Sequence, residues 1–133
     1  MIERFFSNGI KELGTVQTAI YTAPNDMNTA FVTGLFISNI TDRNTSMEVY
    51  LYQKKTDRTI VISGAETPLP AGSTAAIASL GQRLQLTPGD KILVTIGHDK
   101  AADALISVSE IIYSKYELDR MKENAKETAE ENE

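Results

Sequence analysis

The residue types that carry most enzyme chemistry are scarce in this chain, which has no cysteine, no tryptophan and a single histidine, His98. His98 is followed by Asp99, and Asp103 lies a little further along the same polar connection. A histidine beside carboxylates suits a metal site, or a general base whose imidazole is oriented by an acid. The same grouping is typical of a solvated loop, which is the interpretation that we favour. An enzyme working through these three residues is kept as an alternative, and no cofactor is expected.

Two tyrosines form a second candidate site. Residues 46–53 alternate strictly, with Met47, Val49 and Leu51 on one face and Tyr50 and Tyr52 on the other. If the tyrosine face is open, it is a docking patch or a stacking platform for a glycan, because tyrosine combines a large rigid area with a polar end. The other reading is that an N-terminal arm covers this face with Phe5 and Phe6.

The C-terminal residues supply a third candidate site. Leu118, Met121, Ala125 and Thr128 recur at three- and four-residue spacing among charged helix formers, which predicts a helix over residues 115–128. Its apolar stripe is thin, so the helix needs a docking surface or a partner helix. Residues 115–133 hold seven acidic and four basic side chains, so most of the chain's net charge of −5 lies in this tail.

Short β patterns separated by turn residues fill the region between the two ends. Residues 31–40 are apolar at both odd and even positions, which indicates a central strand with both faces covered. We expect them to form a hairpin with residues 46–53. Thr87-Pro88-Gly89-Asp90 has the composition of a tight turn between two strands. The remaining strands are expected in the following ranges: 15–22, 58–63, 74–80, 84–86, 92–96 and 105–113.

Together these elements predict an all-β protein: a single antiparallel β-sandwich, immunoglobulin-like or jelly-roll, of seven to eight strands with a C-terminal charged helix. A chain of 133 residues is enough for one domain. We expect an N-terminal arm at residues 1–14, the sandwich domain at 15–113 and an acidic helical tail at 114–133.

Composition restricts the partners. No apolar run approaches the roughly 20 residues that cross a bilayer, so no membrane span is expected. The net charge of −5 argues against a nucleic-acid partner, whose phosphates are neutralised by Lys and Arg. The apolar stretch near the N-terminus is too short for a signal peptide, which predicts synthesis in the cytoplasm.

Three stretches resemble a known group of proteins. They are the apolar strand 31–40 with its polar loop and tyrosine-bearing strand, Leu69-Pro70-Ala71-Gly72-Ser73-Thr74, and Leu84-x-Leu86-x-Pro88-Gly89-Asp90-x-Ile92. Over most of residues 15–113 the chain is similar to the small β-sandwich proteins encoded among the structural genes of tailed bacteriophages. The acidic helix after Tyr113 departs from the plain sandwich pattern of that family.

This resemblance implies a non-enzymatic virion structural protein, made in the host cytoplasm and carried in the virion. The leading expectation is a capsid decoration (cement) protein that docks through its arm, a sandwich face and its tail. Alternatives are a neck or tail component of the virion, or a small carbohydrate-binding module. Its partners would be other virion proteins and copies of itself, and the candidate interface residues are Phe5, Phe6, Tyr50, Tyr52, Tyr113, Leu118 and Met121.

Overall fold

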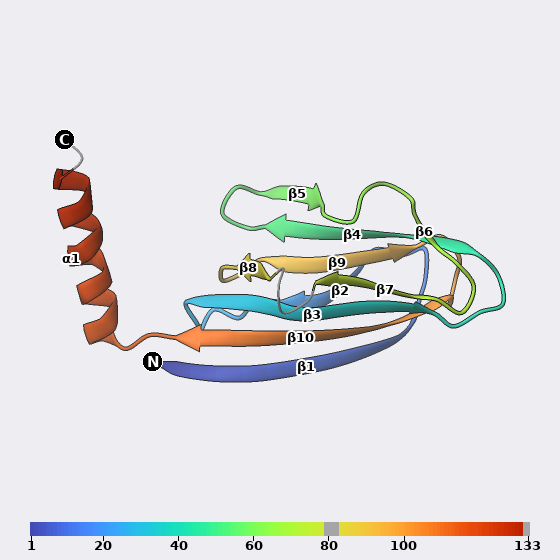
Figure 1. Cartoon of the computed structure of the whole chain (residues 1–133), viewed down its shortest axis with the longest axis horizontal. Coiled ribbons are helices and arrows are strands. Elements are labelled where there is room, and N and C mark those ends of the chain that lie inside the picture. The colour runs from blue at the N-terminus through green and yellow to red at the C-terminus, as the bar shows by residue number, and fades with distance from the viewer. Residues whose placement is uncertain (79–82, 132–133) are drawn as a thin grey trace.

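The computed structural model describes residues 1–78 and 83–131. It contains ten strands and one helix in these ranges (Figure 1): β1 Ile2–Leu13, β2 Thr18–Thr22, β3 Thr29–Asn39, β4 Thr45–Gln53, β5 Arg58–Val61, β6 Thr67–Leu69, β7 Thr74–Ala78, β8 Leu84–Leu86, β9 Lys91–Ile96, β10 Ala102–Ile112 and α1 Lys115–Glu131. Part of the strand expected at 74–80, and the last two residues of the expected tail, lie outside the described residues.

The strands form two antiparallel sheets that face each other. One has the order β1-β10-β3-β7, with β8 also pairing with β3, and the other has the order β2-β9-β4-β5, with β6 also pairing with β4. The predicted antiparallel β-sandwich with a C-terminal helix is confirmed. More than the expected seven to eight strands are described, because β1 and the short β6 join the sheets.

The core lies between the two sheets and follows from alternation. In β9 every second residue is buried, and the same alternation runs along β4 from Thr45 to Leu51 and along β10 from Ala102 to Val108. Full burial of one Val, Leu or Ile contributes about 1.5–3 kcal/mol, so the inward rows of the long strands supply most of the stabilisation. These rows include Val32, Leu35, Ile37, Val49, Ile92, Val94, Ile96 and Ile106.

The hairpin expected from residues 31–40 and 46–53 is wrong, because β3 and β4 belong to different sheets. The connection crosses from one sheet to the other and is held by the buried Asn39, whose Nδ2 donates to the carbonyls of Arg43 (2.7 Å) and Leu69 (3.0 Å). The Asn39 Oδ1 accepts from the backbone N–H of Thr41 at 2.8 Å. The alternation of apolar residues specifies which face of a strand is buried, but it does not specify which strand lies beside it.

The turn expected at Thr87–Asp90 is present and also crosses between sheets. Gly89 has φ 89°, and the Asp90 N–H donates to the Thr87 carbonyl at 3.0 Å. Pro followed by a residue of positive φ is the pattern of a type II turn. The buried Asp90 carboxylate then accepts backbone N–H bonds from Thr87 (2.9 Å) and Lys54 (3.0 Å), which ties this turn to the end of β4.

The residues expected to form an N-terminal arm contain the edge strand β1. Its pairing with β10 runs from Ile2↔Ile112 to Ile10↔Ala104, after which a bulge interrupts the register. In Figure 1 β1 lies along one margin of the molecule with no segment beyond it. The sequence of β1 has no sustained period, and its strand conformation comes from pairing with β10.

Helix α1 follows β10 and projects from one end of the sandwich (Figure 1). Ser114 caps it: its Oγ accepts from the Glu117 N–H at 3.1 Å, and a Glu117 carboxylate oxygen accepts from the Ser114 N–H at 3.4 Å. The N-terminal ammonium of Met1 also forms an ion pair with Glu117. Among the described residues, no helix combines the length and apolarity needed to cross a bilayer.

Candidate functional site

The three residues considered for catalysis make their hydrogen bonds to three different segments. His98 Nδ1 lies 2.7 Å from the Thr45 hydroxyl, at the start of β4. Asp103 Oδ1 accepts from the Glu12 N–H at 2.9 Å. These bonds serve to close loops and to end strand β1.

Asp99 is held by a third segment. One carboxylate oxygen accepts from the Thr15 hydroxyl at 2.8 Å and from its N–H at 3.4 Å. These bonds hold the pKa of Asp99 below its usual value, because they stabilise the ionised form. Asp99 therefore behaves as a fixed acceptor that joins the β1–β2 connection to the β9–β10 connection.

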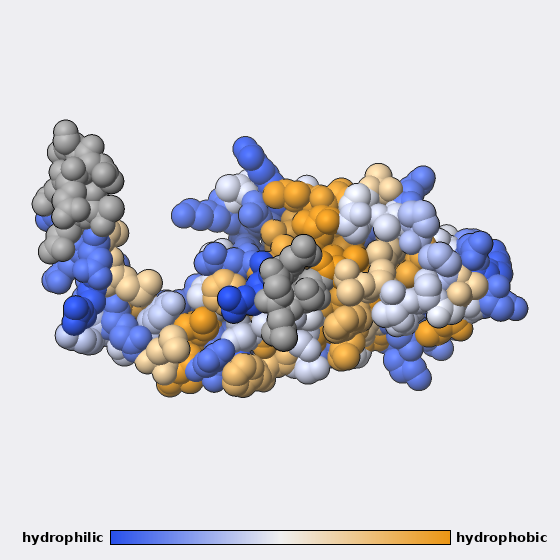
Figure 2. Space-filling view, in the orientation of Figure 1, coloured by the Kyte–Doolittle hydropathy of each residue, from blue (hydrophilic) through white to orange (hydrophobic). Residues whose placement is uncertain are grey.

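The two tyrosines lie on the outer face of the β4 sheet. Tyr50 is aligned across the strands with Val61 on β5 and Leu93 on β9; Tyr50 and Leu93 are half-buried and Val61 is exposed. The reading in which Phe5 and Phe6 cover this face is wrong, since β1 belongs to the other sheet. Figure 2 shows apolar surface over the middle of the molecule, where β4 and β5 run.

Tyr52 has two polar partners, one at its hydroxyl and one over its ring. Its hydroxyl donates to Asp57 at 2.7 Å, and the Lys91 ammonium lies 5.8 Å from the ring centroid. The bond to Asp57 raises the pKa of Tyr52. A sugar ring stacking on this side chain would have to compete with Lys91 for one face of the aromatic ring.

Tyr113, Leu118 and Met121 lie at the junction between the sandwich and the helix. The Tyr113 N–H donates to Asn28 Oδ1 at 2.8 Å, which fixes the end of β10. Tyr113 and Leu118 are half-buried, whereas Met121 is 48% exposed and Tyr116, which the sequence did not single out, is 68% exposed. Helix α1 therefore presents most of its described side chains to solvent.

Phe5 and Phe6 are neighbours in sequence but point to opposite faces of β1. Phe6 lies on the side of the facing sheet, and its ring centroid is 5.7 Å from that of Tyr21. Phe5 points outward and is 82% exposed. Exposure of this size on an edge strand is unusual, since natural proteins keep large apolar groups off free edges.

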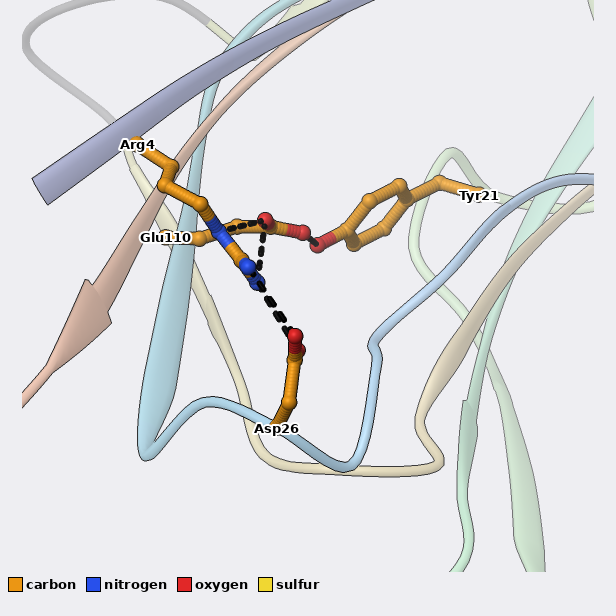
Figure 3. A network of polar contacts seen from close by, with 4 residues as sticks. All are labelled: Arg4, Tyr21, Asp26 and Glu110. Atoms are coloured by element: carbon orange, nitrogen blue, oxygen red, sulfur yellow. Dashed lines mark hydrogen bonds and ion pairs between the residues drawn. The ribbon is translucent and has the colours of Figure 1, made fainter.

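A polar network that the sequence did not predict lies behind β1 (Figure 3). The Arg4 guanidinium makes two bonds to Asp26, of 2.8 and 3.0 Å, and its Nε donates to the buried Glu110 at 3.1 Å. The Tyr21 hydroxyl donates to the other carboxylate oxygen of Glu110. An open groove of about 500 Å³ lies between β1 and β2 beside this network.

The contacts within the network favour the neutral form of Tyr21 and the ionised form of Asp26. Burial and the Glu110 carboxylate raise the pKa of Tyr21, and the Arg4 guanidinium lowers the pKa of Asp26. Both oxygens of Glu110 have a partner, so this side chain on β10 joins β1, through Arg4, to β2, through Tyr21. Arg4 also holds the β2–β3 connection through Asp26. The period-two alternation along β10 could have revealed this buried carboxylate, because Glu110 occupies an inward position between Val108 and Ile112.

The outer face of the β1 sheet is a second apolar surface. Its central row runs across four strands through Gly9, Leu105, Phe36 and Ala76. Leu105 is 45% and Phe36 is 40% exposed. Phe5 lies on the same outer face of the sheet, four residues along β1 from Gly9, with Ser7 and Ser107 between it and this row.

No protein-family model matches the sequence, and no curated protein matches it. Among solved structures, a chain of infectious bursal disease virus, Gx strain, superposes with a TM-score of 0.50 at 12% identity, covering 86% of this chain and 33% of that one. A chain of the infectious bursal disease virus VP2 subviral particle has a TM-score of 0.48 at 12% identity, covering 84% and 33%. A Bacillus endospore appendage, a disulfide-linked pilus, gives 0.49 at 9% identity, covering 84% and 88%.

At 12% identity the superposition on the Gx-strain chain shows a shared fold. The chain spans about a third of the viral chains that it superposes on. The class that the structure establishes is a two-sheet antiparallel β-sandwich with a C-terminal helix.

Proposed function

We propose that this chain is a non-enzymatic structural protein of a virion, and that it decorates the capsid of a tailed phage. The observation that carries the proposal is that Phe5, Leu105 and Phe36, on three adjacent strands, expose large apolar side chains on one outer face of the β1 sheet. Large apolar groups exposed on one face mark protein–protein contacts. A small sandwich that presents one is suited to repeated docking rather than to turnover of a substrate.

Two further features support the proposal. Infectious bursal disease virus provides a chain with the same fold, which is an assembly precedent for this type of sandwich. The polar groups with catalytic potential, His98, Asp99 and Asp103, are each hydrogen-bonded to a separate segment. A neck or tail position in the virion uses the same surfaces and remains the alternative location.

The test is sedimentation of a lysate from the native source, with mass spectrometry for the 14.6 kDa chain in each fraction. We expect the chain in particle fractions of megadalton size after a moderate-salt wash, at a copy number comparable to that of the major shell protein. A copy number of only a few per particle would point to the neck or tail. Recovery only near its own mass would overturn the virion proposal.

A further inference from the structure

We propose that β1 is a self-pairing edge: two copies of the chain join through antiparallel β1–β1 contact across a two-fold axis at Ser7. This inference names a partner within the proposed structural role, and it rests on that role only for its biological setting. The sheet that contains β1 in one copy would then continue into the same sheet of the other copy. The occupant of the free edge is thus a second copy of the same strand.

The edge has the properties that promote strand addition. β1 is 12 residues long, pairs with β10 alone among the described strands, and contains exposed Ile2 (61%) and Phe5 (82%). The unpaired N–H and C=O groups of such a strand are a template for another strand. In the view of Figure 1 helix α1 rises on the side away from this edge, so it leaves the approach open.

Symmetry restricts the register. A two-fold axis perpendicular to an antiparallel pair passes between two copies of one residue, so opposing residue numbers add up to an even number. An axis at Phe6 places Glu3 opposite Gly9, and an axis at Asn8 places Phe5 opposite Lys11. An axis at Ser7 places Glu3 opposite Lys11, twice by symmetry.

Charge and shape both favour the axis at Ser7. Opposite charges facing each other across strands stabilise a pair, and this register forms two Glu3–Lys11 contacts. It also places Phe5 of each copy opposite Gly9 of the other. A Cβ added at Gly9 would meet no atom within 4 Å, so the space beside it is open to an aromatic ring.

The far end of β1 limits the pairing to residues 3–11. The register with β10 is interrupted between Ile10 and Leu13, and Glu12 has φ 57°. The Glu12 N–H is already bonded to Asp103 at 2.9 Å, so it is not free for a second strand. Lys11, at the start of this irregularity, is the last residue that the second copy can contact.

The first test uses the absence of cysteine in the natural sequence. Ser7→Cys places two thiols opposite each other on the axis, where facing Cβ atoms are about 4.5–5.5 Å apart. Ser107→Cys is the matched control: Ser107 lies beside Ser7 on the next strand, β10, outside the β1–β1 contact, and its two copies would be about 14 Å apart, three strand spacings. Mild oxidation of the full chain should give a covalent dimer rapidly for Ser7→Cys and at least tenfold more slowly for Ser107→Cys.

The second test reverses charges. In analytical ultracentrifugation the unmodified chain should show a reversible species of twice 14.6 kDa. Glu3→Lys should weaken the dimer at least fivefold by facing two lysines, and the double variant Glu3→Lys, Lys11→Glu should restore it. Circular dichroism checks that each variant is folded, because Glu3 also accepts a bond from Ser109.

The outcomes are distinct from those of the virion test. A chain that stays monomeric at 100 µM, or equal cross-linking of the two cysteine variants, would overturn self-pairing even if the chain sediments with particles. Species larger than a dimer would overturn the two-fold contact. A dimer that does not sediment with particles would keep this inference and remove the virion proposal.

Discussion

The two sheets of this molecule end in very different edges. β5, at the margin of one sheet, is four residues long. It begins with Arg58 and follows a turn that contains Lys54 and Lys55. β1, at the margin of the other, is 12 residues long and exposes Phe5. Short length and basic charge are the usual protection of a free edge. The contrast indicates that the fold tolerates a protected edge and that β1 has been left open for a contact.

The two edges also differ in how they are attached. β1 is tied to the body by Arg4, which bonds the buried Glu110, whereas the β5 hairpin has the exposed bond from Tyr52 to Asp57. The largest expected effect follows from this difference. Glu110→Ala leaves the buried Tyr21 hydroxyl without its acceptor and should lower the free energy of unfolding by about 2–3 kcal/mol.

Urea unfolding followed by circular dichroism, at a protein concentration that keeps the chain monomeric, measures this loss. Glu110→Gln, which keeps the volume and one acceptor, should cost less. Asp57→Ala is the matched change at the other edge and should stay within about 0.5 kcal/mol. Equal losses at Glu110 and Asp57 would remove the distinction between a tied and a loose edge.

The next effect concerns association. Phe5→Lys gives β1 the kind of charge that protects β5, and it should raise the dissociation constant of the dimer at least tenfold, about 1.4 kcal/mol. Ile60→Lys on β5 is the control and should leave the constant unchanged. Ultracentrifugation over a concentration series provides the measurement. A dimer equally sensitive to both changes would mean that the edges do not differ in function.

The pH dependence of the free energy of unfolding tests the attachment of β1 through Tyr21 and Glu110. Because the pKa of Tyr21 is raised in the folded state, the proton is held more tightly there than in the unfolded chain, where the pKa is about 10. The stabilisation is complete below pH 10 and is lost as the pH rises, by at most about 1.4 kcal/mol per pH unit. Tyr21→Phe should flatten the alkaline fall in unfolding free energy. An unchanged slope in this variant would assign the fall to other groups.

The smallest effect is expected at the helix. Deletion of residues 115–133 should leave a cooperative unfolding transition with a midpoint close to that of the full chain, since α1 projects from the sandwich and most of its described side chains are exposed. Thermal unfolding of the truncated chain tests this. Loss of the cooperative transition would make the helix part of the core.

Sequence patterns predicted which face of a strand is buried better than they predicted which strands pair. Pro88 and Gly89 restrict the backbone locally, so their turn could be identified, and the alternation around Val49 predicted its burial. The partner of β3 could not be predicted, because period-two alternation is the same whichever strand lies alongside. Strand β1 was missed since its conformation depends on β10, about a hundred residues away. Glu110 could have been found, as its parity places it among inward apolar residues.

Helix α1 continues directly from β10, and β10 is flanked by two long strands, β1 and β3. A pull on α1 along the strand direction therefore acts along β10. Hydrogen bonds of an antiparallel ladder lie across the strands, so such a force loads them in shear, all together, rather than opening them one after another. Tension applied through the helix would therefore be borne by the β1–β10 and β10–β3 ladders, the two longest among the described strands.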